Sequence, residues 1–385
     1  MENKNLQIWP TKKILEACAF ERGTEPGSDA YNMDGEGVFF IRVGNIAAQI
    51  QKQIYTTSKN VKLCKKDDIL IALDGSPGVV IRNMEGAYSS GIRKVVLKDT
   101  KKVFYDFIYY VLQTDSVQNV IREHSIGITI KHASKSLDYI KIPLPPLLEQ
   151  KRIVYILDAI QEAIGIQKKI IEKIQELKRT MMKKFFTEGM YSEKLKETEI
   201  GKMPKSWKII KLERALSTKI NYKVGELKQK DFQHNGQFPI IDQSKDFIAG
   251  YSNDMGKVYR GVLPVIIFGD HTRVVKYVNF PFIVGGSGVK VLIPNNEEFE
   301  MLFFFYAINN LKLPSRGYNR HFKFLKDKFI PKPKLHEQRE IAEIFQTIDQ
   351  KIEIEQKKKT LYEELFKTML NKLINREIQT DNLRI

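Results

Sequence analysis

Pro-Leu-Pro-Pro-Leu-Leu-Glu-Gln-Lys-Arg-Ile occupies residues 143–153, and Pro-Lys-Pro-Lys-Leu-His-Glu-Gln-Arg-Glu-Ile occupies residues 331–341. The match extends without a gap over residues 142–188 and 330–376, at a constant offset of 188 residues. A slip of one residue would turn a helical face by about 100°, so an ungapped match keeps the same face in both copies. The period is too long for a solenoid and indicates that a whole unit is duplicated.

Each copy is predicted to form a long helix. Proline disfavours helix upstream of each copy, and Glu149 and Glu337 lie in the first turn, where the helix dipole favours an acid. Apolar residues then recur at alternating spacings of four and three, which is the heptad pattern of a coiled coil. The predicted stripe comprises Ile153, Leu157, Ile160, Ile164, Gln167, Ile171 and Ile174 in the first copy, and Ile341, Phe345, Ile348, Ile352, Glu355, Lys359, Tyr362, Phe366, Met369 and Leu373 in the second. We predict that the two helices pack antiparallel against each other; two independent surface helices are the alternative.

The composition points to an acidic partner. The chain has 385 residues, a formal net charge of +17 and a hydrophobic fraction of 42%, so it can build two or three cored domains. Nucleic acid is the favoured partner and an anionic membrane the second choice. No apolar run reaches about 18 residues and no signal peptide opens the chain, so no membrane association is expected. Cys18 and Cys64 form no CxxC motif and suggest a reducing cytoplasm, with a disulfide between them as the alternative.

Residues 1–141 are predicted to form the first globular block. Short β-rich runs begin at Val38, Ile69, Val79 and Lys94, and glycines between them indicate frequent turns. Helices are expected from Thr11 to about Glu21 and from Phe104 to Val120. A polar, basic strand or loop over residues 125–135 then leads into the first long helix, which is assigned to residues 142–189.

Residues 190–329 are predicted to contain a polar linker, up to about residue 206, and a second block of the same plan. The run Val265-Ile-Ile-Phe-Gly-Asp corresponds to Ile69-Leu-Ile-Ala-Leu-Asp, and Leu302-Phe-Phe-Phe-Tyr-Ala-Ile corresponds to the helix at Phe104. The second long helix is assigned to residues 330–378 and a tail to residues 379–385. Similar scaffolds with different loops suit two different readings of a similar partner.

This order of block, helix, block and helix resembles the specificity (S) subunit of type I restriction–modification enzymes over essentially the whole chain. The repeated segments at 143–153 and 331–341 resemble the central and C-terminal conserved regions of that family. Phe268-Gly-Asp-His-Thr-Arg273 with Gly285-Gly-Ser-Gly-Val-Lys290 resembles one class of its target recognition domains. The first block resembles the family only by position and outline.

The resemblance implies an α+β fold, with two target recognition domains joined by two long helices that form an antiparallel coiled coil. Each domain would read one half of a split double-stranded DNA site. Two modification subunits, which methylate adenine and bind S-adenosylmethionine, would dock on the helices. Restriction subunits, which carry the motor and nuclease and use ATP and Mg, would join later. The family implies no catalytic centre and no cofactor in the S subunit itself.

Enzyme signatures are missing from the sequence. It contains no P-loop, no G-x-G-x-x-G fingerprint, no H-E-x-x-H and no G-x-S-x-G motif. The Asn-Pro-Pro-aromatic tetrapeptide expected of an adenine methyltransferase is also missing. A non-enzymatic DNA-recognition subunit is therefore favoured over a self-contained methyltransferase or nuclease, and over a coiled-coil adaptor without sequence specificity.

Candidate DNA-binding residues lie in polar, basic loops, where arginine, asparagine and histidine can read base edges and lysine can bind phosphate. The candidates are Arg42, Asn45, Arg82, Lys131, His132 and Lys135 in the first block, and His271, Arg273, Lys276, Lys290, Arg316, Tyr318, Asn319, Arg320, His321 and Lys323 in the second. A structural or solvated role is the alternative throughout, and the favoured one in the first block. A metal site at Asp270 and His271 is disfavoured because no second histidine or cysteine pair accompanies them.

Overall fold

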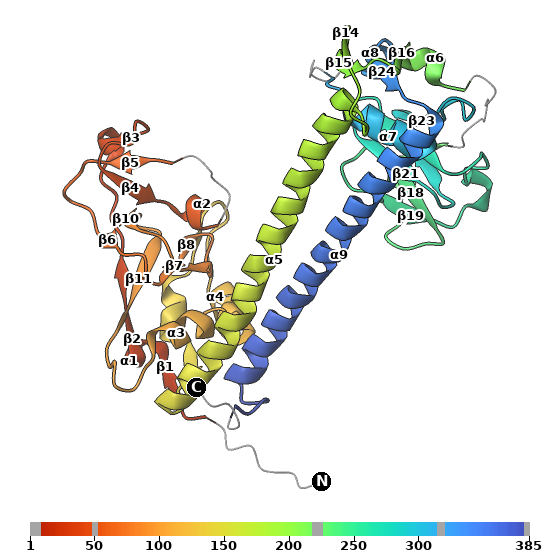
Figure 1. Cartoon of the computed structure of the whole chain (residues 1–385). Coiled ribbons are helices and arrows are strands. Elements are labelled where there is room, and N and C mark those ends of the chain that lie inside the picture. The colour runs from red at the N-terminus through yellow and green to blue at the C-terminus, as the bar shows by residue number, and fades with distance from the viewer. Residues whose placement is uncertain (1–8, 48–52, 218–225, 314–319, 381–385) are drawn as a thin grey trace. The chain divides into compact units, whose positions relative to one another are not determined.

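The structure is a computed structural model that describes residues 9–47, 53–217, 226–313 and 320–380 (Figure 1). The chain divides into two compact units. Unit 1 comprises residues 1–168 with 357–385, and unit 2 comprises residues 169–356. Each unit therefore combines one globular block with a part of each long helix, as an α+β fold.

Unit 1 is built on a five-stranded sheet of order β3-β5-β4-β10-β6, a four-stranded sheet of order β2-β11-β7-β9, and the pairs β1-β13 and β8-β12. Its strands are β1 (Thr11–Lys13), β2 (Cys18–Arg22), β3 (Tyr31–Asn32), β4 (Val38–Ile41), β5 (Tyr55–Thr56), β6 (Leu63–Cys64), β7 (Leu70–Ala72), β8 (Asp74–Gly75), β9 (Val80–Ile81), β10 (Gly86–Tyr88), β11 (Ile92–Leu97), β12 (Lys131–His132) and β13 (Lys141–Pro143). Its short helices are α1 (Ile14–Ala17), η1 (Ser28–Ala30), α2 (Val43–Ile46), α3 (Tyr105–Val111), α4 (Asp115–Glu123) and η2 (Ser134–Asp138).

Two helices predicted in the first block are shorter than expected. The helix expected from Thr11 to Glu21 is wrong except for the single turn α1, because the residues on either side pair as β1 with β13 and as β2 with β11. The helix expected from Phe104 to Val120 is broken into α3 and α4. Thr114 takes an extended conformation between them, and its hydroxyl donates to the Val111 carbonyl at 2.7 Å.

Unit 2 is built on a four-stranded sheet of order β17-β22-β18-β19, a three-stranded sheet of order β21-β20-β23, and the pairs β14-β15 and β16-β24. Its strands are β14 (Leu195–Thr198), β15 (Gly201–Pro204), β16 (Lys208–Lys211), β17 (Glu226–Leu227), β18 (Phe238–Asp242), β19 (Gly250–Ser252), β20 (Val265–Gly269), β21 (Val275–Val278), β22 (Ile283–Gly285), β23 (Val289–Leu292) and β24 (Phe329–Lys332). Its short helices are α6 (Leu212–Ala215), η3 (Gln229–Asp231), η4 (Met255–Lys257), α7 (Met301–Asn309) and α8 (Phe322–Lys326).

The segment predicted as a polar linker folds as the hairpin β14–β15. Lys196 donates through Nζ to the carbonyls of Lys205 and Trp207, at 2.9 and 2.5 Å. Met203 on the second strand is fully buried and packs in one core with Trp207. The hairpin is ordered because this apolar side chain and the lysine bonds fix it to the unit, which its polar composition did not indicate.

The long helices are α5 (Leu147–Glu188) and α9 (Leu335–Ile374). They begin several residues after 142 and 330, because the residues just upstream form strands β13 and β24. After α5 the chain turns at Gly189, which takes a left-handed φ of 71° of the kind that commonly ends a helix. No described helix has the apolar length that a membrane crossing requires.

Within each unit the two long helices run in opposite directions. In unit 1 the start of α5 and the end of α9 share one apolar core, through Ile153 and Leu157 on one helix and Leu373 on the other. In unit 2 the end of α5 meets the start of α9, where the rings of Phe186 and Phe345 stack with centroids 6.3 Å apart. The antiparallel arrangement predicted from the repeat is therefore present in both units.

The predicted heptad stripe is the buried stripe of both helices, with one exception. Every described stripe residue is buried or half-buried apart from Tyr362, which is 37% exposed. The polar positions Gln167 and Glu355 are buried, and Glu355 forms an ion pair with Lys351 at 2.5 Å. The stripe therefore accepts polar side chains where they find partners along the helix.

The repeated glutamines hold each block to its helix by the same set of hydrogen bonds. The Gln150 side chain accepts from the Phe104 amide at 2.8 Å and donates to the carbonyls of Lys102 and Pro145, at 2.9 and 2.8 Å. Gln338 accepts from the Glu300 amide and donates to the carbonyls of Glu298 and Pro333, each at 2.9 Å. Both side chains are fully buried. In each unit the glutamine thus joins the start of α3 or α7 to the first turn of α5 or α9.

Candidate nucleic-acid interface

In unit 1 the polar candidates gather around the strand pair β8–β12. Lys131 pairs with Gly75 and His132 with Asp74 across this short ladder. His132 Nδ1 lies 2.8 Å from Asp74 Oδ1, and the buried Arg93 reaches Asp74 Oδ2 at 3.4 Å and the Ser134 hydroxyl at 2.9 Å. Asp74 is therefore fixed from both sides, and His132 and Lys131 stay exposed above it.

Helix α2 lies against the same loop. Val43 packs so closely on Gly91 that a Cβ at that glycine would lie 2.8 Å from its methyl group, and a Cβ at Gly75 would lie 3.4 Å from its other methyl group. Arg42 begins this helix, and its amide donates to the Asn45 side chain at 2.9 Å. The structure thus brings Arg42 and Asn45 to the same side of the unit as Lys131 and His132, and the Asn45 side chain closes the first turn of α2 on the Arg42 amide.

Two further candidates of unit 1 have different surroundings. Arg82 forms ion pairs with Asp106 at 3.0 Å and Asp158 at 2.5 Å, and its guanidinium lies 4.5 Å from the centre of the Tyr109 ring. These contacts tie Arg82 to α3 and α5, so we leave it out of the interface. Lys135 lies in η2, three residues after His132, and is exposed.

In unit 2 a buried aspartate joins two candidate loops. Asp270 follows β20, and its carboxylate accepts from the Phe322 amide at 2.7 Å while its carbonyl accepts from the His321 amide at 2.8 Å. His321 is only 2% exposed, and its Nδ1 lies 3.1 Å from the same carbonyl. His321 is therefore an internal anchor, which leaves its neighbours Arg320 and Lys323 exposed to solvent.

Lys276 is also an internal anchor. It is 4% exposed and donates through Nζ to the carbonyls of Asp242 and Asp246, at 2.8 and 2.5 Å. A third carbonyl, that of Phe247, lies 3.4 Å away. Burial lowers the pKa of Lys276, and the nearby Asp242 carboxylate opposes that shift. The buried ammonium closes the loop that follows β18 instead of facing DNA.

The loop after β20 is tied to the loop after β18 by a residue that the sequence did not single out. Gln243 accepts from the His271 amide at 3.2 Å through its side chain, and its carbonyl accepts from the Thr272 hydroxyl at 2.5 Å. Arg273 takes a left-handed φ of 64° and donates to the Leu313 carbonyl at 2.8 Å. Its place directly after a β-rich run is the sequence signal that could have identified Gln243 as a loop residue of the site. His271 and Arg273 therefore lie on a loop whose backbone is held in place.

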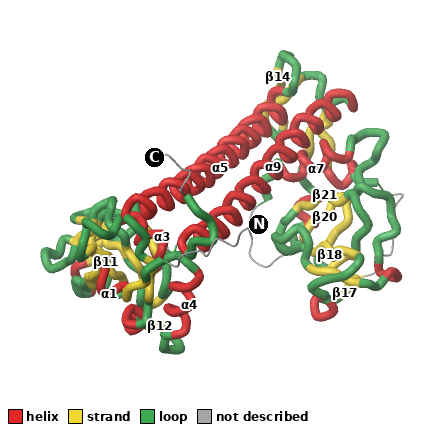
Figure 2. Tube along the Cα trace, turned by 90° about the horizontal axis from the view of Figure 1, so that it is seen from below, coloured by secondary structure: helices red, strands yellow, loops and turns green. Residues whose placement is uncertain are grey.

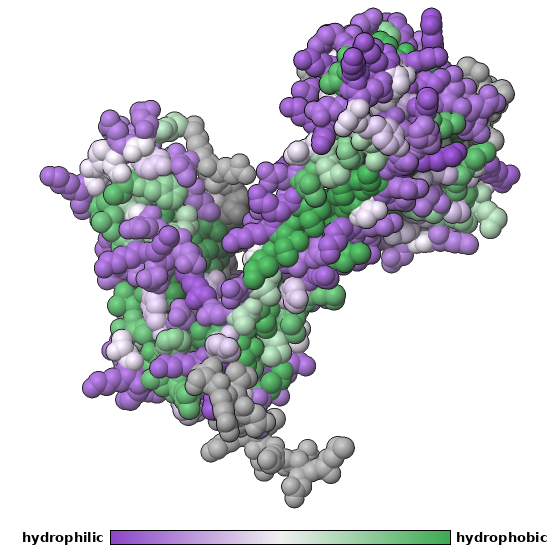
Figure 3. Space-filling view, in the orientation of Figure 1, coloured by the Kyte–Doolittle hydropathy of each residue, from purple (hydrophilic) through white to green (hydrophobic). Residues whose placement is uncertain are grey.

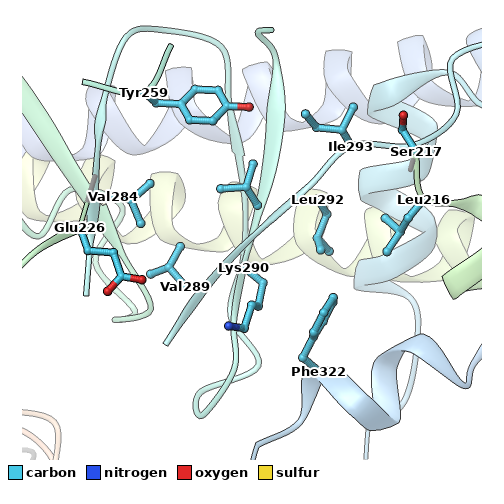
Figure 4. A pocket seen from close by; sticks show the side chains of 11 residues that line it. Leu216, Ser217, Glu226, Tyr259, Val284, Val289, Lys290, Leu292, Ile293 and Phe322 are labelled. Carbon is cyan, nitrogen blue, oxygen red and sulfur yellow. The ribbon is translucent and has the colours of Figure 1, made fainter. Parts of the chain in front are cut away.

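Lys290 lies at the edge of a pocket of about 350 Å³ (Figure 4). The pocket is lined by apolar residues of β22 and β23 together with Tyr259, Glu226 and Phe322. In the close view Lys290 lies between Glu226 and Phe322, so an acid and an aromatic ring flank the ammonium group. Lys290 is half-buried.

The remaining candidates, Arg316, Tyr318 and Asn319, lie outside the described residues. Where the chain is described, no group of three or more histidine, cysteine, aspartate or glutamate residues is arranged to hold a metal ion.

Comparisons with known proteins place these features in one family. The model of the type I restriction modification DNA specificity domain matches residues 7–176 and again residues 199–363. The chain is 30% identical over 369 residues to the specificity subunit of the type I restriction enzyme MjaVIII from Methanocaldococcus jannaschii, covering 86% of this chain and 84% of that protein.

Two solved structures share the fold. The S subunit of the type I restriction–modification system from M. genitalium has a TM-score of 0.63 and 20% identity, covering 97% of this chain and 98% of that one. A chain from a structure of type I R–M complex assembly and conformational transition has a TM-score of 0.55 and 17% identity, covering 96% and 98%.

Proposed function

The chain belongs to the family of type I restriction–modification specificity subunits, and we propose that each of its two units reads one half of a bipartite DNA target. Such a subunit binds DNA within a multi-subunit complex and has no catalytic centre of its own. Family membership favours this function over a coiled-coil adaptor and over a self-contained methyltransferase or nuclease.

One observation carries the proposal for two half-sites. The units hold their blocks to the long helices by the same glutamine bonds, through Gln150 and Gln338, yet their exposed loops carry different residues. Two domains that read different DNA sequences can share one scaffold, but they need different residues in their loops. Base edges are read by side chains on such loops, whereas phosphate contacts fix the orientation.

The basic candidates divide by chemistry. Among the described candidates, the exposed Arg320 and the half-buried Arg42 are left for bidentate contacts to guanine, since Arg82 pairs with Asp158 and Arg273 donates to the Leu313 carbonyl. Lys131 and Lys323 are exposed lysines suited to phosphate. Arg82, Lys276 and His321 support the loops from inside.

The surface of the long helices supports the docking of two copies of one partner. Ile166 on α5 and Ile354 on α9 occupy equivalent positions of the repeat and are 51% and 50% exposed. Leu177 and Leu365 are also equivalent, and are 51% and 44% exposed. Eleven residues separate the two members of each pair, which returns them to the same helical face. A stripe of apolar side chains follows α5 in the view of Figure 3.

We assign these two equivalent patches to two modification subunits. Restriction subunits would then join the assembled complex. S-adenosylmethionine, ATP and Mg would be bound by these partners and not by this chain.

Recognition is tested by the methylation motif of the assembled complex. Arg320→Ala is expected to relax one base position in the second half-site and to leave the first half-site unchanged, at a cost of about 1–3 kcal/mol in binding. Arg42→Ala is expected to do the converse. Sequencing the methylome of a host carrying each variant with its partners gives the motif. If Arg320→Ala keeps the wild-type motif and affinity, the assignment fails.

Docking is tested by stoichiometry. Ile166→Glu with Leu177→Glu is expected to lower the number of modification subunits per chain from two to one, because a buried unpaired charge is costly. Adding Ile354→Glu and Leu365→Glu should remove the second. Gln346→Glu, at an exposed position of α9 about 80° around the helix from Ile354, is the control and should change nothing. Mass measurement of the purified complex decides, and two bound subunits in the fourfold variant would refute the assignment.

A further inference from the structure

A short loop of unit 1 carries three exposed isoleucines. Ile126, Ile128 and Ile130 are 63%, 103% and 55% exposed, so the middle side chain is as open as in an extended peptide. Single exposed apolar residues are common, but three within five residues concentrate apolar area on one projecting tip. The loop lies beside β12 at the edge of the unit next to α4 (Figure 2). None of the functions assigned so far uses this tip.

The base of the tip is ordered. Ile126 and His132 exchange both backbone hydrogen bonds, at 3.0 and 2.8 Å, which closes a loop over residues 127–131. Ala133 then donates to the carbonyl of the fully buried Leu73 at 2.7 Å, so the stem is fixed to the core. The structure therefore presents the isoleucines on a stem that is fixed to the core.

A glycine allows the loop to close. Gly127 has a left-handed φ of 106°, and a Cβ at that position would lie 2.1 Å from the Ile130 carbonyl oxygen. Any other residue would be strained there and would push Ile130 away. The close approach holds Ile128 at the turn of the loop.

Cationic groups surround the apolar tip. Lys131 is the next residue along the loop and Lys135 lies on η2; both are exposed. His132 stands on Asp74, and Arg42 begins α2 on the same side of the unit. An apolar tip among cations suits a ligand that is charged outside and apolar inside, which is how the phosphates and stacked bases of a duplex are arranged.

We propose that Ile128, flanked by Ile126 and Ile130, is a wedge that enters one base step of the duplex bound by unit 1 and partly unstacks it. The inference rests on the proposed DNA recognition by this unit. Apolar side chains inserted between base pairs open the step and kink the duplex, and Lys131 and Lys135 would hold the flanking phosphates. Pyrimidine–purine steps unstack most readily, so the wedge would make unit 1 favour such a step without a hydrogen bond to either base.

The test uses the full chain assembled with its modification subunits, bound to a duplex that carries the sequence motif methylated by the complex. The adenine analogue 2-aminopurine, which brightens when unstacked, is placed at successive positions of the first half-site. In the wild-type complex the fluorescence of 2-aminopurine is expected to increase at one base step. Ile128→Ala should abolish the signal and weaken specific binding about tenfold, since it removes most of a buried apolar side chain. Ile128→Leu should retain both, and Leu63→Ala, at an exposed leucine of β6, should change neither.

The alternative partners of the tip give different results. Unchanged 2-aminopurine brightening in an Ile128→Ala complex would overturn the wedge while leaving recognition intact. Loss of the modification subunits from that variant, or loss of binding to phosphatidylglycerol vesicles with DNA binding unaffected, would assign the tip to a protein or a membrane and would also overturn it. If the wild-type complex bound duplex DNA without salt dependence, the proposed function itself would fail.

Discussion

Replacing Gln338 with alanine should loosen the block of unit 2 from its helix. The side chain makes three hydrogen bonds, each 2.9 Å long, to the backbone at Glu298, Glu300 and Pro333. A buried hydrogen bond contributes about 1 kcal/mol, so their loss should lower the free energy of unfolding by about 3 kcal/mol. For a unit of this size the melting temperature should fall by roughly 6–12 °C. Gln150→Ala breaks the equivalent three bonds and should cost unit 1 a similar amount.

The two variants control for each other, because each residue lies in a different unit. Hydrogen–deuterium exchange should show loss of protection around residues 298–304 in Gln338→Ala and around residues 102–108 in Gln150→Ala. Gln350→Ala removes an exposed glutamine from α9 and should leave stability within about 0.5 kcal/mol. A cost below about 1 kcal/mol for both buried glutamines would show that other contacts hold the blocks, and would refute the reasoning.

Three further expectations concern single side chains. Burial, and then its hydrogen bond to Asp349, raise the pKa of Tyr306, so its contribution is complete below pH 10 and is lost as the pH rises above that value. The Tyr306→Phe protein should show a smaller loss of stability between pH 10 and 11 in urea unfolding than the exposed control Tyr155→Phe. Lys276→Met leaves three loop carbonyls without their donor; exchange over residues 242–247 should rise and the second half-site should become less strictly read. Lys323→Ala should weaken binding to all DNA sequences alike and reduce the salt dependence by about one phosphate, as measured by titration at several salt concentrations.

The framework could be predicted because its signals are repeated and periodic. Heptad spacing and an ungapped internal match predicted both long helices and their antiparallel packing. Local patterns were less reliable where tertiary pairing decides. The apolar run after Thr11 has helical composition, yet only Ile14–Ala17 is helical because β1 and β2 find partners far along the chain. The hairpin at residues 195–204 was missed because its order depends on Met203 and on lysine bonds to carbonyls.

The candidate site was harder to predict, since sequence shows which loops are polar but not which side chains face inward. Lys276 and His321 have the chemistry of DNA-binding residues, yet both are buried and support loops. Arg320, one residue away from His321, is exposed. The isoleucine tip was missed for the opposite reason. Alternating isoleucines over residues 126–130 suggest a half-buried strand, whereas Gly127 turns them outward into a loop.

In each unit a tyrosine of the globular block donates to an aspartate of a long helix, and a basic side chain pairs with that aspartate. The residues that make this contact differ between the two units, which limits the exchange of blocks between the helices. Tyr110 donates to Asp158, and Arg82 from the globular block completes the charge balance. Tyr306 donates to Asp349, and Lys178 completes it from the facing long helix. Asp349 is not the equivalent of Asp158 in the repeat, since the constant offset of 188 places Gln346 there.

The first block, moved onto α9, would therefore meet Gln346 where Asp158 lies now, and Arg82 would keep only its ion pair with Asp106. The loops can diverge freely because they face solvent. Each block and the aspartate of its own helix must change together, because the tyrosine bond and the charge balance at this contact depend on both.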